Sequence, residues 1–371
     1  MRRWLRRLAF VAGALPVVLA FGFAATSGGF ASLGSQAPEI GRSPQYADGH
    51  FENTRAVAVM NAGQSWRTLK EWAASDREVV PRHALPHFAR TTDVLATRPA
   101  SGLRLTWFGH STVLIELDGV RVLTDPIWSA RASPSTIAGP HRFSPPAIRL
   151  SALPSLDAVV VSHDHYDHLD MATVKALAAT GVAFYVPLGV GSHLRRWHVP
   201  DAQIHELDWW QAAVVRGVQL TSVPAQHFSG RAWARNPTLW TSWTLVGPAH
   251  RIYFSGDTGL HDTLPAIADR MGPFDVALVE IGQWHPSWGG IHLGPDGALE
   301  AVHRLRTTTL LPIHWGAFAL ALHGWSEPAE DVFTRAGRAR VLTPLLGEPI
   351  EPVAWTPRAP WWRELDRAAE R

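Results

Sequence analysis

The sequence has 371 residues, which is enough for two ordinary domains or one large α/β unit. Its formal net charge is +2, but four arginines lie between positions 2 and 7 and leave the rest of the chain near −2. This charge excludes a nucleic-acid-binding protein, whose basic residues would cover a working face. The absence of cysteine excludes disulfides, thiolate metal ligands and a cysteine-linked lipid anchor. The 19 histidines and 18 tryptophans are informative only through their positions.

The first residues predict export. A basic cluster precedes an uncharged, mostly apolar run over residues 8–25. This run is short for a membrane-spanning helix and long for the core of a cleaved signal, so both outcomes stay open. We expect residues 1–27 to be a signal peptide of a periplasmic protein, or a signal anchor that holds the catalytic domain outside the cytoplasm at the inner membrane. Residues 28–100 then form a linker and an N-terminal extension that packs on the core.

Strand and helix patterns begin after this extension. Residues 113–117 and 120–124 flank Asp118-Gly119, a dipeptide that favours a two-residue hairpin turn. Residues 171–179 follow a helical pattern, and Asp170 is placed to cap that helix. Strands that alternate with helices predict an α/β architecture.

Four further apolar runs share one feature, because each ends close to a side chain that can bind a metal. The runs and side chains are 158–161 with His163, 218–223 with His227, 251–254 with Asp257, and 308–313 with His314. In α/β proteins, functional residues gather on loops at one edge of a sheet. We expect this functional domain to span residues 101–350 and to be followed by a C-terminal tail over 351–371.

The central motif reads His-Asp-His-Tyr-Asp-His over residues 163–168. His163 and His165 point the same way in an extended segment, and Asp167 and His168 follow a turn later. Four nitrogen or oxygen ligands in one loop exceed what a single catalytic zinc takes from it. Two metals are the economical interpretation, and further ligands come from other strand ends: His227, Asp257 and His314. Two zinc ions are favoured, although such ligands also bind iron or manganese.

These motifs resemble the metallo-β-lactamase superfamily and, within it, the N-acylphosphatidylethanolamine-hydrolysing phospholipase D family. The shared stretches occur in order between residues 103 and 320, and include WFGHSTVLIEL, SHDHYDHLD, ELDWW, FSGDTG and IHWGAFALA. The metal motif defines only the superfamily, whereas ELDWW and IHWGAFALA are more specific. The resemblance implies an αββα sandwich, in which helices flank two mixed β-sheets.

The resemblance also implies roles for the ligands. One metal would be held by His163, His165 and His227. The second would be held by Asp167, His168 and His314, with Asp257 bridging the two. A hydroxide between the metals would attack the substrate, and Asp167 could take a proton from it.

Other residues are assigned around the ligands. Asp125 could orient a ligand imidazole, and His110 could do the same, although turning the loop is an equal alternative for each. The resemblance implies that Tyr166 and His292 bind the substrate head group. The loop before His292 is shorter than in the animal enzymes, and its additional His285 could take over this role. Two tryptophans of this loop, Trp284 and Trp288, could pack in the core, line an acyl groove or meet the membrane interface.

The sequence therefore predicts a phospholipase D-type phosphodiesterase that acts on N-acylphosphatidylethanolamine-like phospholipids. The alternative with the same metals is a lactonase or another small-ester or phosphate hydrolase. A non-catalytic binding protein is disfavoured because no ligand is missing. The expected partners are a phospholipid or small-molecule substrate and the membrane, with no nucleic acid. The oligomeric state stays open, and a homodimer is one possibility.

Overall fold

The computed structural model describes residues 40–59, 71, 77–231, 235–356 and 359–369. The predicted export segment, 1–27, lies outside these residues, as do parts of the predicted extension over 28–100. No helix of the described residues is both long and apolar enough to cross a membrane.

The first of two seven-stranded sheets is mixed, with strand order β16-β3-β4-β5-β6-β7-β8. Strands β16, β3, β4 and β5 are antiparallel neighbours, whereas β5 to β8 are parallel. The strands are β3 (Leu103–Trp107), β4 (Val113–Leu117), β5 (Val120–Thr124), β6 (Ala158–Val160), β7 (Ala183–Pro187), β8 (Ile204–Leu207) and β16 (Pro349–Ile350).

The second seven-stranded sheet is also mixed, with order β15-β14-β13-β12-β11-β10-β9. Its strands are antiparallel from β9 to β12 and parallel from β12 to β15. The strands are β9 (Ala212–Val215), β10 (Val218–Val223), β11 (Ser242–Val246), β12 (Arg251–Phe254), β13 (Val276–Glu280), β14 (Thr309–Ile313) and β15 (Arg340–Val341). Two mixed sheets confirm the predicted architecture.

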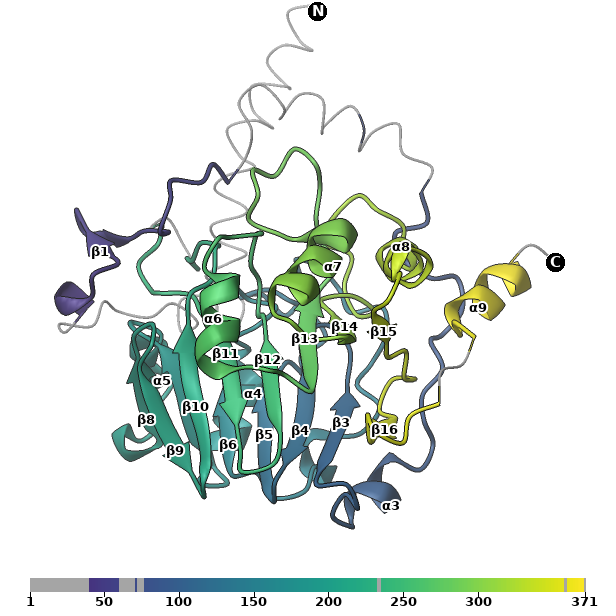
Figure 1. The fold of residues 1–371 in the computed structure, drawn as a ribbon, viewed down its shortest axis with the longest axis horizontal. Coiled ribbons are helices and arrows are strands. Elements are labelled where there is room, and N and C mark those ends of the chain that lie inside the picture. Colours follow the sequence, from purple (N-terminus) through teal and green to yellow (C-terminus); the bar gives the residue numbers. More distant parts are fainter. Residues whose placement is uncertain (1–39, 60–70, 72–76, 232–234, 357–358, 370–371) are drawn as a thin grey trace, which may run out of the picture.

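Helices cover the outer faces of the two sheets. Apolar side chains of α4 and α5 pack with Leu114, Val159 and Phe184 of the first sheet, whereas α7 contacts β13 of the second. Figure 1 shows α6 and α7 in front of the second sheet, with β3 to β6 behind it. The helices are α3 (Thr91–Leu95), α4 (Met171–Ala178), α5 (Gly191–Arg196), α6 (Leu264–Met271), α7 (Gly294–Arg304), α8 (Glu327–Arg335) and α9 (Trp362–Ala369).

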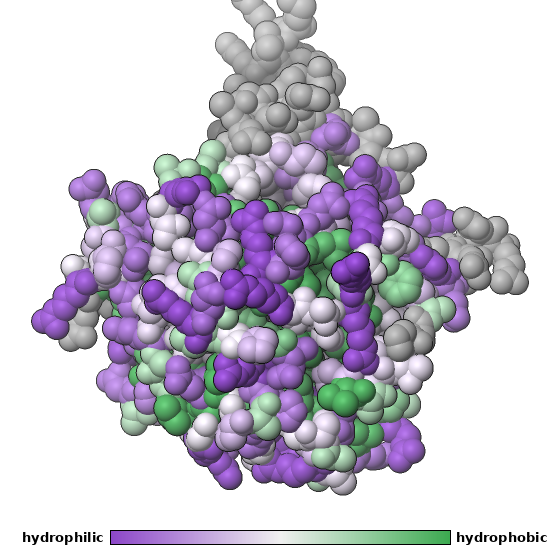
Figure 2. All heavy atoms as spheres, viewed as in Figure 1, coloured by the Kyte–Doolittle hydropathy of each residue, from purple (hydrophilic) through white to green (hydrophobic). Residues whose placement is uncertain are grey.

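The inner faces of the sheets form the main core. Ile115 and Val122 of the first sheet belong to the same apolar cluster as Leu220, Trp243 and Leu245 of the second. On the face shown in Figure 2, hydrophilic residues predominate and apolar residues show between them. This face therefore has the composition of a solvated surface.

Short elements complete the described chain. They are the hairpin of β1 (Tyr46–Ala47) with β2 (His50–Phe51), and three single turns of 3-10 helix, η1 (Ile40–Arg42), η2 (Leu150–Ala152) and η3 (Asp201–Gln203).

The predicted hairpin and helix cap are both confirmed. Asp118 and Gly119 join β4 to β5 with φ values of 49° and 86°, and a two-residue hairpin turn of this kind requires positive φ at both positions. The Asp118 carboxylate also accepts hydrogen bonds from the Ala249 and His250 backbone N–H groups, so the turn is tied to the second sheet. Asp170 caps α4 by accepting from the Ala172 N–H at 3.2 Å.

The segment predicted as a C-terminal tail packs on the core. Trp361 is buried and stacks on Trp315 at a ring distance of 5.7 Å, and Trp362 is buried beside it. Other tryptophans also serve packing, since Trp209 of the ELDWW stretch is buried and Trp240 and Trp243 are fully buried.

Candidate metal centre

The residues predicted as ligands meet at one edge of the sandwich, although they come from four separate loops. His163 follows β6, His227 follows β10, Asp257 follows β12, and His314 follows β14 directly. Carboxyl ends of parallel strands lie at the same edge of a sheet, which explains why Asp257 and His314 meet. The convergence of these loops decides the chemistry that the site can perform.

The first donor set contains His163, His165, His227 and Asp257, whose ligand atoms lie within 4.8 Å of one another. The His165 Nδ1 atom lies 2.8 Å from His163 Nε2 and 3.4 Å from His227 Nε2. Two imidazole nitrogens bound to one tetrahedral zinc are about 3.4 Å apart. The spacing therefore fits a shared cation.

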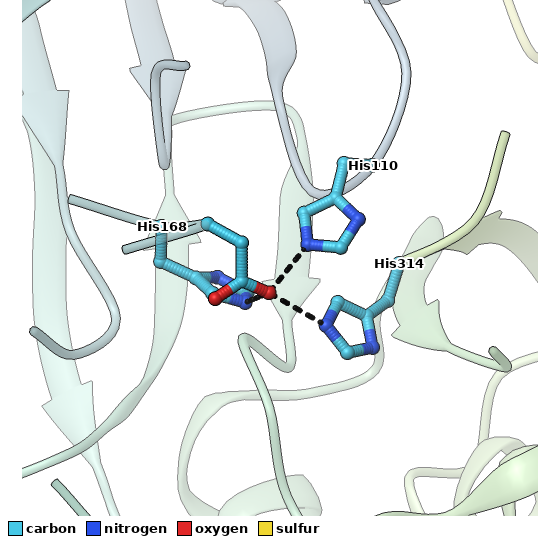
Figure 3. A group of neighbouring side chains, drawn as sticks. His110, His168 and His314 are labelled. Carbon is cyan, nitrogen blue, oxygen red and sulfur yellow. Dashed lines mark hydrogen bonds and ion pairs between the residues drawn. The ribbon is translucent and has the colours of Figure 1, made fainter. Parts of the chain in front are cut away.

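The second donor set contains Asp167, His168 and His314, together with His110. One oxygen of Asp167 lies 3.3 Å from His168 Nε2 and 3.5 Å from His314 Nε2. Figure 3 shows the three labelled histidines turned toward a common carboxylate. An oxygen and two imidazole nitrogens at these distances match the donor types of a catalytic zinc site.

Asp257 lies between the two sets. Its Oδ2 atom is 3.1 Å from His168 Nε2 and 3.2 Å from His314 Nε2, and it is 3.8 Å from both His163 Nε2 and His227 Nε2. The resemblance assigned the bridging position to this residue, and its placement suits that role. The same oxygen can face two cations.

Several buried atoms of the centre lack a hydrogen bond within the described part of the chain: His168 Nε2, His314 Nε2 and Asp257 Oδ1. Buried polar atoms normally have a partner, and unpaired ones indicate a missing ion or water. These donors fit a metal pair because the two unpaired imidazole nitrogens both lie within 3.5 Å of the Asp167 and Asp257 carboxylates.

The charge states of the first donor set support the same conclusion. Burial opposes ionisation of Asp257, but the charges of His168 and His314 hold its pKa well below the usual range. Burial holds the pKa of His163 well below 6.5, and does the same for His227. An ionised Asp257 and neutral His163 and His227 are the forms that bind a divalent cation. At His168 and His314 the carboxylates of Asp257 and Asp167 outweigh burial and raise the pKa of both rings, so a bound cation would have to displace a proton from each.

Comparisons with known proteins agree with this centre. The family model described as a beta-lactamase superfamily domain matches residues 120–315. The chain belongs to the metallo-β-lactamase superfamily.

An uncharacterized protein of Mycobacterium tuberculosis is 45% identical over 343 residues, which are 90% of this chain and 92% of that protein. The N-acyl-phosphatidylethanolamine-hydrolyzing phospholipase D 1 of Caenorhabditis elegans is 38% identical, over 68% of this chain and 74% of that protein. Among solved structures, the metallo hydrolase Igni18 of Ignicoccus hospitalis matches with 25% identity and a TM-score of 0.52, over 67% of this chain and 97% of that one. This member of the metallo-β-lactamase superfamily is a metal-dependent hydrolase.

Asp125 lies behind a ligand imidazole of this metallo-β-lactamase centre. Its Oδ2 atom is 2.7 Å from His168 Nδ1, and its two oxygens also accept from the backbone N–H and the hydroxyl of Ser162. A proton on Nδ1 directs His168 Nε2 to the metal side. The Ser162 hydroxyl lies 2.9 Å from His163 Nδ1, so Asp125 acts on both histidines.

His110 has a different partner from the one expected. Its Nε2 atom lies 2.8 Å from the Asp167 carboxylate, so it contacts a ligand carboxylate and not the outer nitrogen of an imidazole. Burial, reinforced by the charge of His314, lowers the pKa of His110 to about 3, which makes it a neutral donor to Asp167. Its position follows from the loop after β3, which brings the His110 ring to 4.4 Å from that of His314.

Local backbone strain accompanies these positions. His110, Asp125 and His314 have positive φ values of 52°, 33° and 68°. Such conformations cost about 1–3 kcal/mol each and persist where the surrounding structure fixes them. The fold therefore holds these three side chains in place at a cost in stability.

Tyr166 and His292 lie in different surroundings. The Tyr166 hydroxyl donates to the Arg231 carbonyl at 2.7 Å, and the Arg231 guanidinium lies 4.0 Å above its ring. His292 lies among the ligand rings, with its centroid 5.0 Å from that of His227. The competing His285 contacts the Ser287 hydroxyl and Glu71 instead. Trp288 lies 5.6 Å from the His292 ring, and both tryptophans of this loop are half-buried.

Sequence analysis does not select Glu280, which the structure places in a third group with Asp257, His292 and His314. It is the last residue of β13 and is fully buried. An available signal was the charge at the end of the apolar run VALVE, the same pattern that located the other ligands.

Proposed function

We propose that this chain is a phospholipase D-type phosphodiesterase that cleaves N-acylphosphatidylethanolamine-like phospholipids with the help of two zinc ions. The observation that carries the proposal is the pair of donor sets that share Asp257. Two neighbouring metals suit displacement at phosphorus, where the attacking and leaving oxygens both need charge stabilisation. The name of the 38% identical Caenorhabditis elegans protein directs the choice of lipid.

Each zinc ion would take three ligands of its own and share Asp257: His163, His165 and His227 on one side, and Asp167, His168 and His314 on the other. When bound, the zinc ions would lower the pKa of water to about 7 and neutralise charge on phosphoryl oxygens. Asp167 is the more exposed of the two carboxylates, at 14% against 3% for Asp257. It is therefore the better proton acceptor for an incoming water, and its hydrogen bond from His110 keeps it in place.

A pocket beside the ligand loop, lined by both polar and apolar residues, supports a phosphate-bearing lipid substrate. It has a volume of about 340 Å³, and its lining includes Tyr166, Arg131 and several hydroxyl residues: Ser129, Ser133, Ser135 and Thr136. Hydroxyl groups and a guanidinium are suitable partners for a phosphodiester and its glycerol oxygens.

The proposal includes placement outside the cytoplasm, with residues 1–27 as a cleaved signal or a retained anchor. A lipid substrate in the membrane agrees with either outcome. Mass determination of the mature N-terminus, with fractionation of cells into membrane and periplasm, distinguishes the two.

The decisive experiment uses purified zinc-loaded protein and a defined N-acylphosphatidylethanolamine in ¹⁸O-labelled water. We expect an N-acylethanolamine and a phosphatidate that carries one ¹⁸O atom, because attack at phosphorus places the new oxygen there. His165→Ala should lose this activity, whereas His303→Ala, a change of an exposed histidine on α7, should retain it. Turnover of a lactone panel without any phospholipid cleavage would favour the lactonase alternative and refute the proposal.

A further inference from the structure

We propose that Glu280 is a positioning residue that holds His292 with a proton on Nδ1 and so presents its Nε2 atom to the substrate. That His292 meets a substrate rests on the proposed hydrolase function, whereas the orientation of its ring does not.

The Glu280 carboxylate has nitrogen neighbours on both oxygens. Its Oε1 atom accepts from the Thr258 N–H at 2.8 Å and from the Leu293 N–H at 3.2 Å. Its Oε2 atom lies 2.7 Å from His292 Nδ1 and 3.3 Å from His314 Nδ1. One buried side chain thus joins the Asp257 loop, the start of α7 and two histidines.

The chemistry of the pair fixes the His292 proton. An ionised carboxylate only accepts hydrogen bonds, so the nitrogen 2.7 Å from Glu280 must carry the hydrogen. The other nitrogen, Nε2, is left for a substrate. The His292 side chain is 10% exposed and Glu280 is 0% exposed, so solvent reaches the imidazole but not the carboxylate behind it.

Neighbouring rings hold this orientation. The His292 ring stacks on His314 with a centroid distance of 5.4 Å and an interplanar angle of 15°. It also meets His227 at 5.0 Å and Trp288 at 5.6 Å. With three ring neighbours and a fixed Nδ1, the imidazole has little freedom to rotate.

A third cation held by Glu280 is the competing explanation, since its oxygens lie within 4.8 Å of ligand atoms of Asp257, His292 and His314. The hydrogen bonds argue against it. Both backbone N–H groups point at Oε1, and two imidazole nitrogens lie at Oε2, so each oxygen already faces two nitrogen atoms. Donors placed in this way compensate a buried carboxylate without a metal.

The test combines ¹⁵N NMR of histidine-labelled, zinc-loaded protein with kinetics on the lipid substrate. In the wild-type protein we expect His292 Nδ1 to be protonated, with its signal assigned by its loss in His292→Gln. In Glu280→Gln the amide oxygen can keep the Thr258 and Leu293 bonds, and the amide NH₂ then faces His292 Nδ1. The proton should therefore move to Nε2, and kcat should fall about 10- to 100-fold, as for other residues behind a reacting group.

Metal content provides the check on this interpretation. His314 Nδ1 also donates to the Gly282 carbonyl at 2.9 Å, so Glu280→Gln should retain both zinc ions. The change should add no further loss of kcat in a His292→Ala background. The matched control Glu300→Gln, which alters a carboxylate paired with Arg304 on α7, should leave the spectrum and kcat unchanged.

An unprotonated His292 Nδ1 in the wild-type protein would overturn the proposal, and so would loss of zinc from Glu280→Gln. The NMR measurement on the wild-type protein does not depend on how well the variant folds. If the wild-type protein cleaves no phospholipid, the proposed function fails, whereas the His292 tautomer still decides the role of Glu280.

Discussion

The metal centre and a neighbouring tryptophan cluster, formed by Trp107, Trp315, Trp361 and Trp362, begin at adjacent residues of one loop and are built in opposite ways. Trp315 stacks on Trp107 at 5.0 Å and meets Trp362 edge-on at 5.4 Å. The indole N–H of Trp107 donates to the His110 carbonyl at 2.9 Å, and that of Trp315 donates to the Pro312 carbonyl. The cluster is complete with protein atoms alone, whereas the adjoining centre leaves buried atoms without hydrogen bonds. Packing therefore stabilises the tryptophan cluster, whereas the buried polar atoms of the metal centre need a ligand to complete their interactions.

Asp257→Ala should have the largest effect on activity. This effect should be confined to the metal centre. Removing the shared carboxylate deprives both donor sets of an oxygen, so we expect kcat to fall about 1,000-fold. Metal analysis should show less than two zinc ions per chain, with a thermal unfolding temperature close to that of the metal-free wild type. Retention of both ions with full activity would contradict the bridging role.

Trp362→Ala should destabilise the tryptophan cluster. The side chain is 1% exposed and packs on three aromatic rings, so truncation leaves a large cavity. We expect the free energy of unfolding to fall by about 3–5 kcal/mol in urea titrations. Zinc content per folded molecule should stay the same, and a coupled loss of metal would show that the two regions are not separate.

Asp125→Asn tests how far the centre depends on residues behind its ligands. The amide can place a donor against His168 Nδ1, which turns the ring away from the favoured tautomer. We expect zinc affinity or activity to fall about 10- to 100-fold. Competition with a chelator measures the affinity, and an unchanged constant would assign Asp125 to loop turning only.

Asp164→Asn should give the smallest effect, a loss of stability that depends on pH. Burial opposes its ionisation, but the hydrogen bond with His193 prevails and lowers its pKa to about 2. A carboxyl whose pKa is lowered by folding stabilises the protein above its unfolded pKa of about 3.9, and this contribution disappears as the pH falls toward 2. We expect the free energy of unfolding of the wild type to exceed that of Asp164→Asn by about 2 kcal/mol at pH 6. At pH 2.5 the difference should be much smaller. A difference that stays constant in urea titrations at both pH values would contradict the lowered pKa.

Local signals in the sequence predicted the loops that carry the ligands. The Asp118-Gly119 turn, the Asp170 cap and the apolar runs before His163, His227 and His314 are local features that the structure retains. Local signals could not predict side-chain contacts that tertiary packing creates between distant parts of the chain. Nothing near His110 in the chain indicates that its ring meets Asp167, 57 residues later.

Strand pairing in the two sheets could not be predicted for the same reason. Apolar runs identify buried strands but do not say which strands pair, and the burial of Trp361 in a predicted tail depends on contacts with Trp315 and Trp325. Glu280 was missed because a charged residue at a strand end is usually a solvated one. Only its neighbours from other loops explain its burial.

The pairing of β16 with β3 has a consequence for biosynthesis. Residues 349–350 border the strand that begins at Leu103, so the first sheet gains its outer strand only from the last part of the domain. During translation, the edge of β3 stays uncovered until almost the whole domain has left the ribosome. Such sequence-distant contacts slow folding and leave a nascent chain open to chaperones. A chain truncated before residue 349 should therefore aggregate, even though every metal ligand has already been made.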